Sequence, residues 1–319
     1  MIAVLLLLAI SQETVQTVPG AHDQLDTKLL ATLRHERKRG ALLRNKKSAL
    51  LISDPTCSFY YTETVHQLRA QVERAHEKDG RQVFLITSCA ENEGKSTVAC
   101  NVGRAIATSG MRVCLVESDM RNRTLANMLG VRSSGGLYAV LSETMPLQQA
   151  IVPAGVDNMF LLDAEPHIPN PADILASKRF ALLVDKLEQM FDYVIFDTPP
   201  VGMFVDAAVV STIADASVLV VRENFTKRQT VLQAYDQLQK AGGHVVGVAM
   251  NYCNVEKSDY YYAYYNQQGK REKGAESVPQ VDARQFAPEQ ARKSGKHGSH
   301  GGAANPANYG RMSNNGVRR

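Results

Sequence analysis

The four residues Gly94-Lys95-Ser96-Thr97 combine a positive charge with hydroxyl groups, in a pattern that binds phosphate in many proteins. In such a loop the backbone N–H groups face the phosphates, the lysine adds a positive charge, and the hydroxyl after it coordinates Mg²⁺. We therefore expect ATP and Mg²⁺ as cofactors. The residues predicted to bind the nucleotide are Glu93, Gly94, Lys95, Ser96 and Thr97, together with a later residue, Asn251.

The start of this loop departs from the usual pattern, because Cys89 stands where a glycine is common. Asn92 can supply the left-handed backbone conformation that glycine would otherwise give. An apolar segment over residues 83–87 predicts a strand before the loop, and apolar positions from Val98 to Ile106 predict a helix after it. A strand, a loop and a helix in this order support a phosphate-binding site more strongly than the four residues alone.

Acidic residues close two further apolar segments. Glu117 and Asp119 follow residues 113–116, and Asp197 follows residues 193–196. Open parallel sheets bind ligands at the carboxyl ends of their strands, so we expect these carboxylates to face the bound phosphates. One of Glu117 and Asp119 would help to hold Mg²⁺, and the other would accept a proton from an attacking hydroxyl. The predicted Mg²⁺ ligands are Ser96, Glu117 and Asp197.

Apolar segments alternate with amphipathic segments between residues 83 and 253. Further strands are predicted over residues 216–221 and 245–250. One helix is predicted from Asn170 to Leu187, with proline at its first helical position, and another from Thr226 to Leu238. This alternation indicates an α/β fold, a three-layer P-loop NTPase in which helices cover both faces of a mainly parallel central sheet.

Composition divides the chain of 319 residues into three parts. We expect a partial membrane-proximal helix and basic linker over 1–57, a globular domain over 58–255, and a tyrosine cluster with a disordered polar tail over 256–319. The net charge of +4 is too mild to point to nucleic acid. The five cysteines form no C-x-x-C pair, which is typical of small buried side chains in a reducing compartment.

The first part contains an apolar run over residues 2–10 and a basic stretch from Arg34 to Lys47. As a helix the run would span about 13 Å, against roughly 30 Å for the core of a bilayer. Two interpretations stay open. The run is either an apolar element packed on the domain, or the end of a transmembrane helix whose first half is missing. The basic stretch would suit the cytoplasmic side of a membrane.

A cluster of tyrosines follows the last predicted strand. It consists of Tyr260, Tyr261, Tyr262, Tyr264 and Tyr265. Their spacing is neither helical nor alternating, which argues against a buried stripe, although an aromatic cluster stacked on a partner remains the alternative. The functional interpretation is a set of accessible phenol hydroxyls, each of which would gain about −1.5 to −2 charges on phosphorylation.

Between about Ser58 and Tyr265 the chain resembles the bacterial tyrosine kinases of the CpsD/CapB type, the kinase half of polysaccharide co-polymerase systems. The resemblance rests on Thr87-Ser88 with Gly94-Lys95-Ser96-Thr97, on Leu115 to Arg121, on Phe196 to Pro200, on Pro169-Asn170-Pro171 and on the tyrosine cluster. It implies an ATP-dependent kinase that autophosphorylates this cluster and regulates capsule or exopolysaccharide synthesis and export. The residues that it marks as catalytic are Lys95, Glu117, Asp119, Arg121 and Asp197, with Glu117 in place of the family's usual aspartate.

The resemblance also implies partners. Subunits of this family form a ring through a helix with an E-x-x-R-x-x-R pattern, where this chain has Glu63, His66 and Arg69. Further implied partners are a membrane co-polymerase segment, fused or separate, that activates the kinase, and a cognate tyrosine phosphatase. The segment 26–38 resembles the linker that joins membrane helix and kinase in fused proteins. The implied location is the cytoplasmic face of the cell membrane.

Two other functions fit parts of the sequence. A partitioning-type ATPase switch of the ParA/MinD kind shares the expected fold, but its signature lysine would stand where this chain has Ala90. Such a switch also has no use for a tyrosine cluster. A catalytically weak ATP-binding scaffold is the other alternative, and Glu117 and Cys89 leave it open.

Overall fold

The computed structural model describes residue 15 and residues 27–36, 50–166 and 168–253. Within these ranges the strands are β1 (Leu29–Arg34), β2 (Val83–Ser88), β3 (Val113–Glu117), β4 (Ile151–Pro153), β5 (Met159–Leu162), β6 (Tyr193–Asp197), β7 (Ala216–Arg222) and β8 (Val245–Cys253). The helices are α3 (Phe59–Asp79), α4 (Lys95–Thr108), α5 (Leu125–Leu129), α6 (Leu137–Leu141), α7 (Leu147–Ala150), α8 (Pro171–Leu175), α9 (Lys178–Met190), α10 (Asp206–Ser211) and α11 (Arg228–Lys240). The apolar run over residues 2–10, most of the basic stretch and the tyrosine cluster lie outside the described residues.

The described strands form one sheet with the order β1-β8-β7-β2-β6-β3-β5-β4. Neighbouring strands are parallel except β4 and β5, which are antiparallel. The predicted mainly parallel α/β sheet is therefore confirmed. The strand β2 that precedes the phosphate loop pairs with β6, and β6 pairs with β3. The loop and the two acidic strand ends consequently meet at one edge of the sheet.

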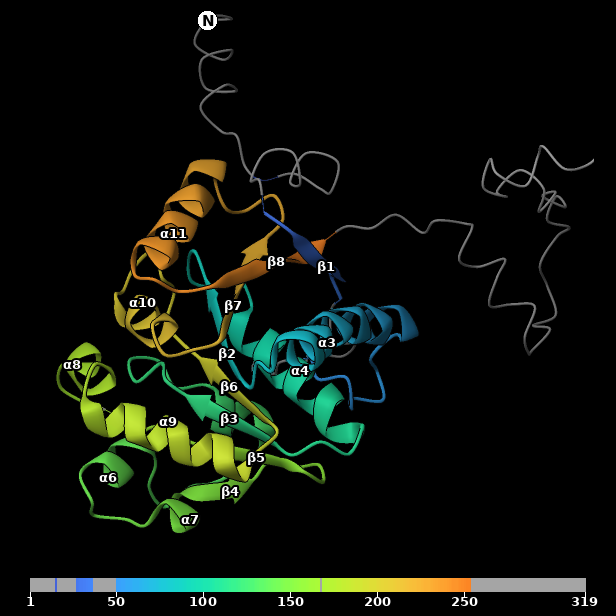
Figure 1. Cartoon of the computed structure of the whole chain (residues 1–319). Helices are drawn as coiled ribbons and strands as arrows, with labels where there is room; N and C mark the ends of the chain where they lie inside the picture. Colours follow the sequence, from blue (N-terminus) through green and yellow to red (C-terminus); the bar gives the residue numbers. More distant parts are fainter. Residues whose placement is uncertain (1–14, 16–26, 37–49, 167, 254–319) are drawn as a thin grey trace, which may run out of the picture. The chain divides into compact units, whose positions relative to one another are not determined.

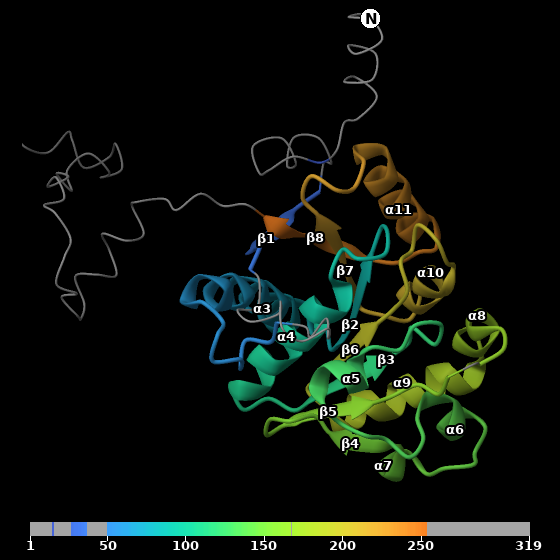
Figure 2. The ribbon, with the colours of Figure 1, turned by 180° about the vertical axis from the view of Figure 1, so that it is seen from behind.

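Helices cover the two faces of this sheet, as Figures 1 and 2 show from opposite sides. The helices α3 and α4 contribute to one buried apolar cluster, and α9, α10 and α11 contribute to another. The side chains of β2 alternate between them, with Phe84 and Ile86 in the first cluster and Val83 and Leu85 in the second. Burial on both faces explains why this strand is a continuous apolar run. The predicted three-layer arrangement is confirmed.

The strand β1 lies inside the segment 26–38, which the sequence suggests is a linker. Residues Leu29–Arg34 pair in parallel with β8 at the edge of the sheet. Leu30 and Leu33 are buried in the apolar cluster that includes α3. The folded unit thus includes residues on the N-terminal side of Ser58, where the domain was expected to begin and where helix α3 is capped.

The single helix expected from Asn170 to Leu187 is divided into α8 and α9. Between them Ser177 adopts an extended backbone, and its hydroxyl accepts a hydrogen bond from the N–H of Phe180 at 3.2 Å. This N-cap starts a new helix without interrupting the apolar periodicity, which explains the wrong prediction. Within the described residues, no helix is both long and apolar enough to cross a membrane.

Candidate active site

The loop between β2 and α4 has the backbone that phosphate binding requires. Asn92 adopts a left-handed conformation with φ of 63°, as the sequence predicts, and Gly94 has φ of 90°. A Cβ atom on Gly94 would lie 2.3 Å from Nδ2 of Asn251, so only glycine fits this close approach. Helix α4 begins at Lys95, directly after the loop, and its N-terminal N–H groups supply the partial positive charge that attracts phosphate.

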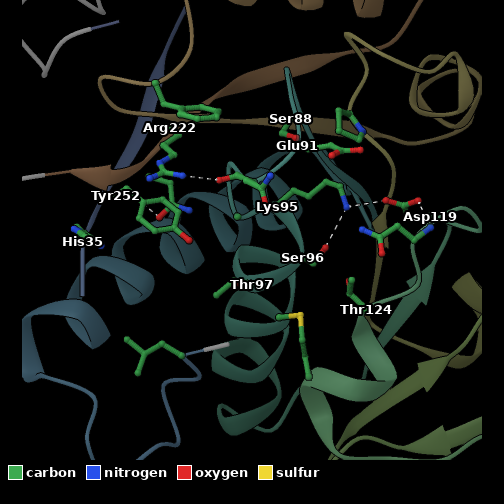
Figure 3. A pocket seen from close by; sticks show the side chains of 18 of the residues that line it. His35, Ser88, Glu91, Lys95, Ser96, Thr97, Asp119, Thr124, Arg222 and Tyr252 are labelled. Atoms are coloured by element: carbon green, nitrogen blue, oxygen red, sulfur yellow. Dashed lines mark hydrogen bonds and ion pairs between the residues drawn. The ribbon is translucent and has the colours of Figure 1, made fainter. Parts of the chain in front are cut away.

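The ammonium group of Lys95 contacts the side chains of Asp119 and Ser96 (Figure 3). Its Nζ is 3.0 Å from Oδ2 of Asp119, 3.1 Å from Oγ of Ser96 and 3.6 Å from Oδ1 of Asp197. Burial by itself would lower the pKa of Lys95, but the carboxylates of Asp197, Asp119 and Glu117 outweigh it and raise the pKa. The lysine is therefore positively charged and held by these carboxylates.

Asp197, at the end of β6, is fully buried. Neither of its carboxylate oxygens has a hydrogen-bond partner among the described residues, and its close charged neighbour is Lys95. Burial raises the pKa of Asp197, and the positive charge of Lys95 partly opposes this. Buried carboxylate oxygens that lack donors fit a site completed by a cation and its water molecules. Together with the hydroxyl of Ser96, they match the donor set expected for Mg²⁺.

Glu117, at the end of β3, is used differently. Its Oε2 accepts hydrogen bonds from the N–H groups of Thr124 at 2.7 Å and Leu125 at 2.9 Å, and its Oε1 accepts one from Asp119 at 3.2 Å. The carboxylate therefore satisfies N–H groups at the start of α5. Burial, followed by the nearby charge of Asp197, raises the pKa of Glu117 well above its ordinary value. The role of Glu117 as base or Mg²⁺ ligand stays a prediction, and the structure shows its carboxylate bonded to backbone N–H groups.

Glu93 also lies beneath the pocket rather than in it. Its carboxylate accepts hydrogen bonds from the N–H groups of Ala90 at 2.6 Å and Arg222 at 3.1 Å, and a short one from the hydroxyl of Thr226. Burial raises the pKa of Glu93, and these hydrogen bonds oppose the rise. The side chain of Asn251 donates to the backbone carbonyl of Glu93 at 2.8 Å. Glu93 thus connects the loop to the end of β7, and Asn251 connects it to β8.

A pocket of about 1200 Å³ opens over this edge of the sheet. The predicted site residues that line it are Gly94, Lys95, Ser96, Thr97, Asp119, Arg121 and Asn251. The guanidinium group of Arg121 lies 4.5 Å from the centre of the Phe204 ring and 3.2 Å from the buried carboxylate of Asp206. Arg121 is thereby held at the mouth of the pocket rather than against Lys95.

One wall of the pocket was not predicted. The guanidinium group of Arg222 lies 4.7 Å from the ring centre of Phe225 and 4.4 Å from that of Tyr252, and the Tyr252 ring is 5.2 Å from that of His35. Arg222 also donates to the carbonyl of Asn92 at 3.2 Å (Figure 3). The position of Tyr252 directly after Asn251 is a signal that could have been used. No sequence signal points to His35, because it reaches the pocket only through the pairing of β1 with β8.

The residues expected in the ring interface lie apart from the pocket, on α3. Arg69 forms an ion pair with Glu73 at 3.0 Å and donates to the carbonyl of Ala105 at 3.2 Å. Glu63 and His66 are partly exposed on the same helix. Ring formation by these residues stays a prediction.

The chain is similar to several known proteins. A family profile described as ParA, NUBPL iron-transfer P-loop NTPase, matches residues 80–299. The tyrosine-protein kinase CpsD of Streptococcus pneumoniae is 32% identical over 195 residues, which is 60% of this chain and 86% of CpsD. The tyrosine-protein kinase YwqD of Bacillus subtilis is 30% identical over 71% of this chain and 94% of its own length. The crystal structure of the chimerical protein CapA2B2 aligns with a TM-score of 0.66 and 27% identity, over 74% of this chain and 99% of that one.

Proposed function

The chain belongs to the bacterial tyrosine-protein kinases of the CpsD type, within the ParA-type P-loop NTPases, and from this premise we propose how it acts. It transfers the γ-phosphoryl group of ATP to tyrosine hydroxyls. Its own cluster from Tyr260 to Tyr265 is the acceptor, and phosphorylation of that cluster regulates capsule or exopolysaccharide synthesis and export.

One observation carries the proposal: Lys95, Ser96, Asp119 and Asp197 converge within hydrogen-bonding or ion-pair distance at the mouth of a phosphate loop. Ser96 and Asp197 would hold Mg²⁺, which supplies positive charge to the phosphate oxygens. Lys95 neutralises the charge that develops on the transferred group. The new bond joins the tyrosine oxygen to the γ-phosphorus, and the bond between that phosphorus and the bridging oxygen of ADP breaks.

Asp119 is the better candidate to receive the phenol proton. Its carboxylate lines the pocket and accepts hydrogen bonds from Lys95 and from the N–H of Asn122, whereas the carboxylate of Glu117 lies outside the pocket lining and accepts three backbone N–H groups. A base that is already committed to three donors would have to break the start of α5 in order to act. We therefore assign proton acceptance to Asp119 and support of the loop 118–124 to Glu117.

Mass spectrometry after incubation with Mg-ATP tests the proposal. Wild-type chain should gain phosphate on tyrosines within residues 260–265, and the Lys95→Met variant should gain none, since its phosphates lose their fixed charge. Lys240→Met is a matched control, because Lys240 is exposed on α11 and pairs only with Asp236 among the ion pairs of the described part. Labelled Lys95→Met protein that remains folded by circular dichroism would refute the assignment.

The same proposal extends to the partners. A membrane co-polymerase segment, fused or separate, activates the kinase at the cytoplasmic face of the membrane. Subunits assemble in a ring through α3. A tyrosine phosphatase removes the phosphate from the tyrosines by hydrolysis. In support, β1 brings His35 and Glu36 from the N-terminal segment to the lining of the pocket. Light scattering of wild type and a Glu63→Ala variant checks the ring, whose mass should fall in the variant.

The second candidate function is an ATP-binding scaffold without efficient catalysis. The bonds of Glu117 to three backbone N–H groups favour it, because they withdraw one acidic group from the reaction. ATP binding without phosphate on any tyrosine, even after addition of the activating membrane segment, would establish this function in place of the kinase.

A further inference from the structure

An apolar surface lies beside the catalytic groups and is not used by the mechanism above. It consists of Met203, Phe204 and Val205, which we call the apolar ledge. The side chains of Met203 and Val205 are 54% and 61% exposed, and they are among the most exposed large apolar side chains of the described residues. Phe204 lies between them and lines the same pocket as Lys95 and Asp119. Met203 and Val205 do not line the pocket, but they flank Phe204 in sequence, and exposed large apolar side chains at the edge of a pocket are typical of a surface that a substrate covers.

The ledge is fixed to the phosphate loop. The N–H of Val201 donates to the carbonyl of Ser88 at 2.9 Å, and the N–H groups of Met203 and Phe204 both donate to the carbonyl of Pro200 at 3.0 Å. A Cβ atom on Gly202 would lie 2.3 Å from the carbonyl oxygen of Cys89, so the two loops touch through their backbones. The ledge therefore holds a constant position relative to the helix that carries Lys95.

A guanidinium group completes this surface. Arg121 lies over the Phe204 ring at 4.5 Å, and its charge is paired with Asp206, which is buried in the first turn of α10. A planar guanidinium held against one aromatic ring can stack with a second ring on its other face. The surface thus offers apolar contact to neighbouring side chains and a stacking partner to an aromatic one.

We propose that the apolar ledge, with Arg121, binds the phosphoacceptor segment of the kinase and selects tyrosines that have aromatic or small apolar neighbours. The occupant is a segment of the sequence Tyr260–Tyr265, in which every neighbour of a tyrosine is a tyrosine or Ala263, apart from Asp259 and Asn266 at its ends. Its rings can cover Met203 and Val205 while one phenol points toward Asp119. The inference rests on the proposed kinase function and adds its acceptor specificity.

The chain outside the described part is consistent with this occupant. Asn251 and Tyr252 line the same pocket, and Cys253 is the last of the described residues. The tyrosine segment begins at Tyr260, and such a stretch of chain reaches at most about 25 Å when extended. The segment with the aromatic character that the ledge requires is therefore tethered to a rim residue of the pocket by a short connection.

Steady-state kinetics with a free acceptor test the proposal. The acceptor is a synthetic peptide of residues 256–267, the enzyme is the full chain with Mg-ATP, and phosphate on the peptide is measured by mass spectrometry. In a double variant, Met203→Ser with Val205→Ser, we expect the KM for the peptide to rise about tenfold because apolar contact is lost. The kcat at saturating peptide and the KM for ATP should stay unchanged. In a second peptide, a single tyrosine is flanked by serines. The KM for this peptide should be the same for wild type and the double variant.

The matched control is Leu182→Ser, since Leu182 is 59% exposed on α9 and does not line this pocket. A KM for the peptide that is the same in the double variant as in wild type would overturn the proposal, as would an equal rise in the control. If wild type phosphorylates no acceptor at all, the kinase function fails instead. Fluorescence anisotropy of the labelled peptide then tests binding to the ledge by itself. Equal affinity of wild type and the double variant for the peptide would still refute the proposal.

Discussion

The ends of β3 and β6 place two carboxylates side by side, and the protein treats them in opposite ways. Glu117 and Asp197 are partners in the register of the two parallel strands, and both are fully buried. Burial raises the pKa of each. Yet Glu117 accepts three backbone hydrogen bonds, whereas Asp197 accepts none from the described residues.

In the mechanism that we propose, this difference separates a supporting carboxylate from one that takes part in the reaction. A buried polar group without a partner costs about 1–3 kcal/mol, so it persists where function requires it. Asp197 keeps both oxygens available next to Lys95 and Ser96, where phosphate and a cation are expected to bind. Glu117 uses its additional methylene group to reach the N–H groups of Thr124 and Leu125. Two acidic strand ends that look equivalent in sequence thus have different hydrogen-bond surroundings.

The largest expected effect is on catalysis, in an Asp197→Asn variant. The transfer rate should fall by about 100-fold or more, because the amide cannot hold a cation as a carboxylate does. The free energy of unfolding should stay the same or rise, since a buried carboxylate without donors is removed. Phosphotyrosine formation and urea unfolding measure the two quantities. If Asp197→Asn unfolds more easily but still transfers phosphate, Asp197 would be the supporting carboxylate instead of Glu117.

The second effect is on stability, in a Glu117→Ala variant. Two N–H groups at the start of α5 and the N–H of Asp119 would lose their acceptor, and we expect the free energy of unfolding to fall by about 2–4 kcal/mol. Urea unfolding measures this loss, with Asp197→Asn as the matched control that removes a buried charge and its ion pair with Lys95 but no backbone hydrogen bond. Equal stability of the two variants would show that the bonds of Glu117 contribute little.

The convergence of Lys95, Ser96, Asp119 and Asp197 could be predicted from sequence because parallel strands end at a common edge. The three-layer fold followed for a similar reason, since continuous apolar strands alternate with amphipathic helices. The destination of Glu117 could not be predicted, because it depends on the path of the chain over residues 118–124. The wall formed by Arg222, Tyr252 and His35 was missed because it joins the ends of β7, β8 and β1, three strands that are distant in sequence.

A Glu117→Asp variant sharpens the comparison with a smaller change. The shorter side chain should withdraw from the N–H groups of Thr124 and Leu125, and we expect a loss of about 1 kcal/mol of stability. Phosphate transfer should change by only a few-fold, since the carboxylate is not the base in our assignment. The measurements are urea unfolding and phosphotyrosine formation. If the rate of phosphate transfer in Glu117→Asp differs from that of wild type by orders of magnitude, Glu117 takes part in the reaction.

The smallest expected effect is a dependence of stability on pH that distinguishes wild type from Asp197→Asn. Burial raises the pKa of Asp197 in the folded protein above its ordinary value of about 4, although Lys95 at 3.6 Å offsets part of the rise. Below that ordinary value the carboxyl is protonated in both states and folding bears no penalty. As the pH rises through the folded pKa, the folded protein must hold a buried carboxylate and loses stability. Asparagine has no proton to lose, so the stability of the variant relative to wild type should increase from pH 4 toward neutral pH.

Urea unfolding of the protein without Mg²⁺ and nucleotide, at several pH values between these limits, measures this difference. The charge of Asp197 also helps to raise the pKa of Glu117, so its removal lowers that pKa and adds to the expected difference in the same direction. Asp236→Asn is the control, because this aspartate is exposed on α11 in a pair with Lys240. A difference between Asp197→Asn and wild type that shrinks as the pH rises would mean that the positive charge of Lys95 outweighs burial. Asp197 would then be a partner that stabilises the lysine, rather than a carboxylate held at a cost for the reaction.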